Sequence, residues 1–166
     1  MLGFKRIASR LRQLAPSRHT YSPSAIVYIN LDTRPDRRRE VEAALGSLPY
    51  RVPIHRIAAT AHEQNGHIGC GISHIEALEW ARAQGLEEVL IVEDDFALAT
   101  PPSNFARQLS RFMRDEPSRD VASLHATYKN DLIETPMQGL YRFGPEGYAT
   151  TTLAYLAHRR ATAALL

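Results

Sequence analysis

Apolar runs and amphipathic stretches alternate along this sequence, and the alternation predicts strands and helices in turn. The runs 25–31 (AIVYINL) and 87–95 (EEVLIVEDD) are β-rich and unbroken, which is typical of strands buried on both faces. Between them, residues 32–46 place apolar positions at helical spacing, with Pro35 in the first turn and Gly46 at the end. The order strand, helix, strand predicts an α/β fold with a mostly parallel sheet.

The other elements follow from weaker patterns. Residues 50–59 alternate weakly and contain Pro53, which predicts a strand near a sheet edge. The segment 62–71 has three glycines and predicts a loop, and residues 72–85 predict a helix. The finer expectations are a cap on the first helix from Asp32 or Thr33, inward-facing Ile72, Ile75 and Leu78, a helix from Pro101 to about Arg114, a strand at 121–126, and a strand turning into a helix at 151–166.

Length and charge indicate one domain with a basic tail. The chain has 166 residues and a net charge of +2, and residues 1–31 carry Lys and Arg but no acidic residue. We assign residues 1–22 to a basic tail and linker and residues 23–166 to the domain. The tail is either a frayed terminus or an amphipathic anchor on anionic lipid.

Several function classes are disfavoured. A single cysteine, Cys70, excludes a disulfide framework and suits a reducing compartment. No run of about 18 apolar residues predicts a membrane span. Nucleic-acid binding is not expected, because the basic residues gather in the tail and aromatic residues do not interleave with them.

Three consecutive carboxylates, Glu93, Asp94 and Asp95, end the second apolar run. They repel one another unless a cation or arginines neutralise them, and carboxylate oxygens suit Mg²⁺ or Mn²⁺. Ligand crevices of α/β sheets form at this end of a strand. The alternative is a solvated acidic turn that binds no metal.

One interpretation of these carboxylates is that they belong to a signalling domain. The run VLIVEDD resembles the opening strand of a response-regulator receiver domain, and residues 131–140 (DLIETPMQGL) echo the stretch after its phospho-acceptor. However, the acidic pair lies past the middle of the chain, Asp131 follows TYKN and not a buried strand, and no lysine follows Lys129. A receiver-like domain is therefore a remote alternative.

A second resemblance accounts for more of the chain. The segments VYINLDTRPDRR, HIGCGISHIEALEWA, VLIVEDDFAL and YATTTLAYLAHRRATAALL, in this order, resemble glycosyltransferase family 25, a family of lipooligosaccharide-processing galactosyltransferases and related enzymes. The resemblance covers residues 25–166, and the order of the four segments is more specific than any one of them. It implies a GT-A type, Rossmann-like domain that binds a nucleotide sugar.

The resemblance also implies roles for individual residues. Arginines, glycine amides and a helix N-terminus suit a diphosphate, whereas Glu93–Asp95 would be the counterpart of the metal-binding DxD motif. Asp95 would hold Mn²⁺ or Mg²⁺ together with Glu93, and either Asp94 or Glu93 would reach the ribose or support the metal. The residues expected to bind the substrate are Asn30, Asp32, Arg34, Arg37, Gly69, Gly71, Ser73, His74 and Glu93, and those expected to be catalytic are Asp94, Asp95 and Asp131.

Alternatives stay open for some of these residues. Asp131 and Glu146 are both candidates for the general base. Ser73 could be an ordinary residue near a helix N-terminus, and His74 a core histidine with its hydrogen bonds satisfied. Cys70 is more typical of a small packed residue than of a nucleophile.

The implied reaction is metal-dependent hexosyl transfer. Galactose would pass from UDP-galactose to a glycan or lipid-linked acceptor such as a bacterial lipopolysaccharide core, at the cytoplasmic face of the membrane. Members of the family usually continue beyond the segment that matches residues 148–166. The sequence therefore also fits a C-terminally truncated, catalytically incomplete remnant that binds a nucleotide sugar.

Overall fold

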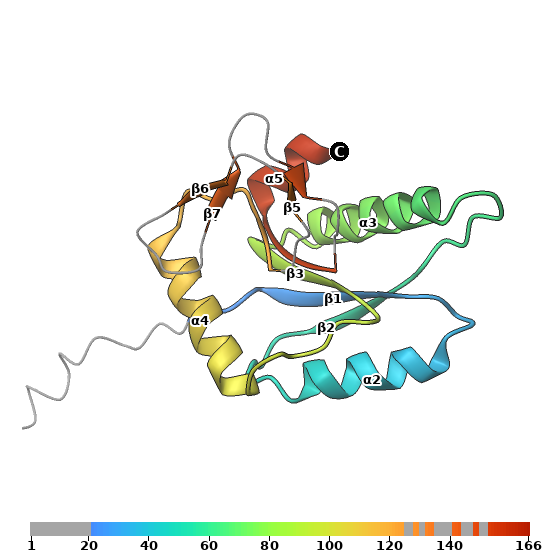
Figure 1. Cartoon of the computed structure of the whole chain (residues 1–166), viewed down its shortest axis with the longest axis horizontal. Coiled ribbons are helices and arrows are strands. Elements are labelled where there is room, and N and C mark those ends of the chain that lie inside the picture. The colour runs from blue at the N-terminus through green and yellow to red at the C-terminus, as the bar shows by residue number, and fades with distance from the viewer. Residues whose placement is uncertain (1–20, 125–127, 130–131, 135–140, 144–147, 150–152) are drawn as a thin grey trace, which may run out of the picture.

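The computed structural model describes residues 21–124, 128–129, 132–134, 141–143, 148–149 and 153–166. In this part of the chain five strands form one mixed sheet, in the order β2-β1-β3-β9-β4 (Figure 1). Their bounds are β1 Ala25–Asn30, β2 Ile54–Ala58, β3 Glu88–Glu93, β4 Val121–Ser123 and β9 Ala154–His158. The neighbours β2, β1 and β3 are parallel, whereas β9 is antiparallel to β3 and β4. The centre of the sheet is therefore parallel, as predicted, and β9 makes it mixed.

Helices cover both faces of this sheet. The described helices are α2 Pro35–Gly46, α3 Gly66–Ala83, α4 Pro102–Asp115 and α5 Arg159–Leu165. Helices α2 and α4 pack on one face, and α3 packs on the other with α5 beside it (Figure 1). None of the described helices has the length and apolar character that crossing a bilayer requires. This layered arrangement confirms the α/β class and is consistent with a Rossmann-like domain.

Two small antiparallel pairs lie outside the main sheet. Strand β5 (Tyr128–Lys129) pairs with β8 (Tyr148–Ala149), and β6 (Leu132–Glu134) pairs with β7 (Tyr141–Phe143). The strand expected at 121–126 is β4, which ends at Ser123, and residues 125–126 lie outside the described residues.

The two apolar runs form the centre of the fold because each of their faces meets a helix. Alternate residues of a strand point to opposite faces of the sheet. On the α2 and α4 face the core includes Ile26, Tyr28, Leu90 and Val92, together with Val41, Leu45, Leu109 and Met113. On the α3 face it includes Val27, Ile29, Val89 and Ile91, together with Ala77, Leu78 and Ala81. The weakly alternating segment forms β2, an edge strand, as predicted.

The structure corrects two details of the helices. Neither Asp32 nor Thr33 caps α2; Arg34 is at the N-cap and makes no capping hydrogen bond from its side chain. Helix α3 begins at Gly66, inside the predicted loop, and the Asn65 side chain caps it by accepting a hydrogen bond from the backbone of His67.

The inward face of α3 also differs from the prediction. Ile72 and Ile75 are exposed, and small residues such as Ser73 and Ala77 face the sheet, while Leu78 is buried as expected. Small side chains let the helix approach the sheet closely, so the bulkier isoleucines point away from it.

Candidate functional site

The candidate site lies at the carboxyl edge of the parallel strands. Strands β2 and β3 flank β1 on opposite sides, so the helices that follow β1 and β2 cover opposite faces of the sheet. In open α/β sheets ligands bind where the chain leaves in opposite directions, outside the carboxyl ends of the strands. The ends of β1 and β3 and the N-terminal ends of α2 and α3 meet at this edge.

Asn30, the last residue of β1, organises the polar groups there. Its side chain is almost fully buried, and its Nδ2 donates hydrogen bonds to Asp94 Oδ2 at 2.8 Å and to the Arg34 carbonyl at 3.0 Å. Its Oδ1 accepts a hydrogen bond from Arg56 Nε at 3.2 Å. Arg56 in turn pairs with the Asp32 carboxylate. Asn30 therefore fixes the turn after β1 against the turn after β3.

The two aspartates after β3 have different surroundings. Arg37 Nη1 of α2 lies 3.1 Å from Asp94 Oδ1 and 4.0 Å from Asp95 Oδ2. The Asp94 side chain is only 11% exposed, whereas that of Asp95 is 53% exposed. Arg37 and Asn30 thus compensate the charge of Asp94 within the protein, and Asp95 presents its carboxylate to solvent.

Arg34 lies at the rim of this group. Its guanidinium binds both carboxylate oxygens of Asp36, at 2.7 to 3.2 Å. These hydrogen bonds hold the pKa of the Asp36 carboxyl well below its usual range. Both side chains are exposed, so solvent weakens this pair, and Arg34 can exchange Asp36 for another anion at small cost.

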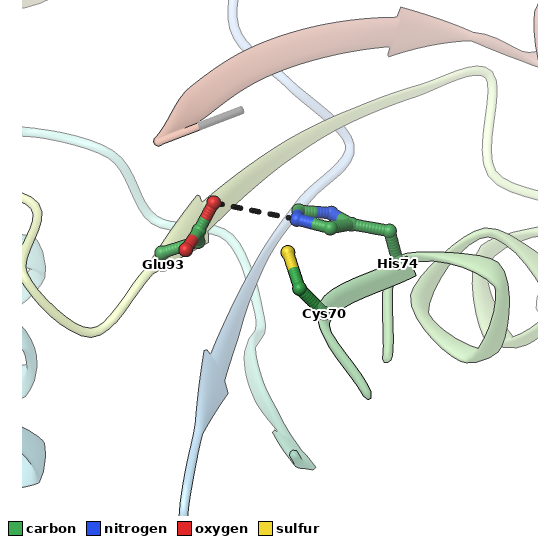
Figure 2. Close-up of side chains that lie close together, drawn as sticks. All are labelled: Cys70, His74 and Glu93. Atoms are coloured by element: carbon green, nitrogen blue, oxygen red, sulfur yellow. Dashed lines mark ion pairs between the residues drawn. The ribbon is translucent and has the colours of Figure 1, made fainter. Parts of the chain in front are cut away.

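Glu93 belongs to a different group of side chains. It continues the alternate positions Val89 and Ile91 of β3, so it points to the α3 face, where its Oε1 lies 3.5 Å from His74 Nε2 (Figure 2). His74 Nδ1 lies 3.1 Å from the Tyr155 hydroxyl. Burial, with a contribution from the charge of Glu93, raises the pKa of Tyr155 far above its usual value, so this hydroxyl stays protonated.

Cys70 completes the group on the α3 face. The ligating atoms of Cys70, His74 and Glu93 all lie within 4.8 Å of one another, and the sulfur points toward the other two side chains (Figure 2). Within the described residues these are the only three or more His, Cys, Asp or Glu side chains so placed. Glu93 therefore faces the α3 group, whereas Asp94 and Asp95 approach Arg37, and the assignment of Glu93 and Asp95 to one ion stays a prediction.

Gly69 and Ser73 hold the loop between β2 and α3. Ser73 Oγ accepts a hydrogen bond from the Thr60 backbone N–H at 2.8 Å and donates one to the Gly69 carbonyl at 2.8 Å, and Ser73 is fully buried. A Cβ on Gly69 would lie 2.2 Å from the Thr60 carbonyl oxygen. Gly71, by contrast, is exposed on α3 with open space around it. Gly69 and Ser73 thus have clear packing roles, and their role in substrate binding stays a prediction.

Replacing Ser73 by alanine is expected to lower the free energy of unfolding by about 1 to 3 kcal/mol, because the partly buried N–H of Thr60 loses its acceptor. Urea denaturation followed by circular dichroism measures this change. Serine to alanine at Ser103, near the start of α4, is the matched control and should change stability by less than about 0.5 kcal/mol. Equal stability of the Ser73 variant and the wild type would contradict this role.

Some predicted residues cannot be placed, and others were missed. Asp131 and Glu146 lie outside the described residues, so the general base stays a prediction. Arg56, Cys70 and Tyr155 also lie at the site, although the sequence predicted no site role for them. Cys70 and His74 are one helical turn apart in the sequence, and this spacing could have indicated that the two side chains lie together. Nothing in the local sequence marks Arg56 or Tyr155, because the sheet pairing brings them to the site.

Comparisons with known proteins give related but partial matches. No family model matches the chain. The human protein named "Inactive glycosyltransferase 25 family member 3" is 37% identical over 94 residues, which cover 54% of this chain and 15% of the human protein. The mouse protein of the same name is 35% identical over 94 residues, again 15% of its length, and the rat protein named "Probable inactive glycosyltransferase 25 family member 3" is 34% identical over 94 residues. The match thus spans about one sixth of these relatives and about half of this chain.

Proposed function

We propose that this chain is a nucleotide-sugar-binding domain of the glycosyltransferase family 25 type, and that it is catalytically incomplete. Similarity to relatives whose names contain "inactive" supports the second part of this proposal. The α/β fold, with polar side chains at the carboxyl edge of parallel strands, supports the first part.

The observation that carries the proposal is the link between the ends of β1 and β3. Asn30 and Arg37 both bind Asp94, and Asp95 remains exposed next to them. A nucleotide diphosphate needs cationic groups and N–H donors, which Arg37, Arg34 and the first turn of α2 supply. Asp32, which pairs with Arg56 and is exposed to solvent, offers a hydrogen-bond acceptor to a ribose hydroxyl.

A divalent ion fits this edge by its donor chemistry. Asp95 supplies exposed carboxylate oxygens, the ligand type that Mn²⁺ and Mg²⁺ prefer, and the phosphates of the ligand supply more oxygens. Asp95 would hold the ion, and Asp94 would stay with Asn30 and Arg37. When bound, the ion would neutralise part of the diphosphate charge.

Calorimetric titration tests the proposal. Wild-type protein should bind UDP-galactose in the presence of Mn²⁺, and Asp95→Asn should weaken this binding by about tenfold or more, because it removes a charged ligand. Glu79→Gln, an exposed change in the second half of α3, is the control and should bind as the wild type does. Failure of the wild type to bind any UDP-sugar would refute the proposal.

An active hexosyltransferase is the second candidate, and the exposed carboxylate of Asp95 beside Arg37 favours it. Under this hypothesis galactose passes to a surface glycan or lipid-linked acceptor, and the basic residues of 1–22 hold the protein at the cytoplasmic face of the membrane. Assaying the same samples for free galactose and UDP separates the two candidates. Mn²⁺-dependent turnover that Asp95→Asn abolishes would favour the active enzyme, whereas binding without turnover supports the incomplete one.

A further inference from the structure

The cluster on the α3 face of the sheet has a chemistry that the proposed nucleotide-sugar site does not use. It combines a thiol, an imidazole and a carboxylate from Cys70, His74 and Glu93, whose ligating atoms lie within 4.8 Å of one another (Figure 2). All three residues are partly buried. A nucleotide sugar is recognised by hydrogen-bond donors and hard oxygen ligands, so it does not account for a sulfur and a nitrogen donor in one place.

The elements that carry these side chains hold them in place. Cys70 and His74 are one turn apart on α3, so their side chains lie on the same side of that helix. Glu93 is the last residue of β3, which lies inside the sheet between β1 and β9. A helix and an interior strand are rigid supports, which favours a preorganised site.

The separations are close to those of a tetrahedral zinc site. Zinc bonds of about 2.0 to 2.3 Å in tetrahedral geometry place neighbouring ligand atoms about 3.3 to 3.8 Å apart. His74 Nε2 and Glu93 Oε1 are already 3.5 Å apart, and the remaining distances are no greater than 4.8 Å.

His74 is oriented as a metal ligand would be. Its Nε2 is buried and makes no hydrogen bond to any of the described residues, although it faces the cluster. Its Nδ1 is held by the Tyr155 hydroxyl at 3.1 Å. In metal sites the second ring nitrogen commonly donates to such an oxygen, which fixes the tautomer and leaves the Nε2 lone pair for the metal.

We propose that Cys70, His74 and Glu93 form a binding site for Zn²⁺, on the opposite face of the sheet from Asp94 and Asp95. Sulfur and imidazole donors select zinc over Mn²⁺ and Mg²⁺, which prefer oxygen. Three protein ligands leave the fourth position to water or to another small ligand. Tyr155 is a positioning residue of this site, because it acts through His74.

Zinc binding to the untagged full chain tests this inference independently of any UDP-sugar. In competition with a chromophoric chelator, the wild type should bind one Zn²⁺. Cys70→Ser and Glu93→Gln should each lose about tenfold or more in affinity, and Tyr155→Phe should lose about 10 to 100-fold. His67→Ala removes an exposed imidazole from the same helix and should bind zinc as the wild type does.

Cobalt reports whether the sulfur takes part. Co²⁺ bound to the wild type should show a thiolate charge-transfer absorption in the near ultraviolet, and Cys70→Ser should lose it while Glu93→Gln keeps it at higher Co²⁺ concentrations. Circular dichroism of each metal-free variant confirms that it is folded. Absence of zinc binding by the wild type, or unchanged affinity in folded Cys70→Ser and Glu93→Gln, would overturn the proposal and leave an ion pair between His74 and Glu93 beside a packed cysteine.

Discussion

Replacing Gly69 by alanine is expected to lower the free energy of unfolding by about 2 to 3 kcal/mol, as for overpacked core positions. The added Cβ would lie 2.2 Å from the carbonyl oxygen of Thr60 and 3.2 Å from the backbone nitrogen of His62. Both contacts are with backbone, which cannot rotate away as a flexible side chain can. Either α3 or the loop after β2 must therefore shift, and the hydrogen bonds of Ser73 to both segments resist that shift.

Gly71 is the matched control, two residues along the same helix. Nothing lies within 4 Å of a Cβ added there, so alanine should raise the free energy of unfolding by up to about 1 kcal/mol through its better helix propensity. Urea denaturation of both variants measures the two effects. Equal effects of the two substitutions would show that Gly69 does not pack against the Thr60 backbone as described.

Replacing Arg119 by methionine is expected to lower the free energy of unfolding by about 3 to 5 kcal/mol, the range for a buried ion pair that loses one partner. Arg119 pairs with Glu88 at the start of β3, and their side chains are only 8% and 11% exposed. Arg119 Nη1 also donates hydrogen bonds to the carbonyls of Met113 and Glu116, so the variant orphans several acceptors.

Two further variants distinguish the cost of leaving a buried charge unpaired from the cost of losing side-chain packing at Arg119 and Glu88. In Arg119→Met/Glu88→Leu no buried carboxylate is left without its cation, so this double variant should be more stable than Arg119→Met alone. Arg111→Met removes a partner of Asp115 from an exposed pair and should cost less than about 1 kcal/mol. A cost for Arg119→Met as small as that for Arg111→Met would contradict the burial of the pair.

The central strands and their helices could be predicted because local and tertiary preferences agree there. Residues 25–29 and 89–92 are apolar on both faces, and only an interior strand covered by helices on both sides buries them fully. The antiparallel direction of β9 has no such local signal. Its residues 154–157 are apolar on both faces as well, and an interior strand shows this pattern in either direction.

Helix α3 was harder to predict because its sequence combines conflicting signals. The glycines between Gly66 and Gly71 favour a loop, yet Asn65 caps a helix there, and Gly69 is needed so that the helix can touch the Thr60 backbone. The isoleucines at 72 and 75 suggested the wrong inward face. Tertiary packing favours small residues on the face that meets the sheet, and this preference outweighs side-chain hydrophobicity at those positions.

The partners of the acidic residues Glu93, Asp94 and Asp95 could not be predicted from the sequence alone. Three consecutive carboxylates suggest one metal site, but only Glu93 belongs to β3, where alternate side chains point to opposite faces of the sheet. Glu93 meets His74 on the α3 face, whereas Asp94, in the turn after the strand, meets Asn30 and Arg37. The alternation of side chains along β3, which places Glu93 on the α3 face, could be predicted from the sequence. The partners of each carboxylate required the pairing of β1 with β3 and the positions of α2 and α3.

The edge formed by Asn30, Arg37, Asp94 and Asp95 is expected to bind the diphosphate of a nucleotide sugar. Anomalous diffraction from crystals grown with Mn²⁺ and UDP tests it most directly. We expect a manganese peak within coordination distance of Asp95, with the UDP phosphates next to it and to Arg37. A UDP molecule bound at another surface, or the absence of both ligands from this edge at saturating concentrations, would contradict it.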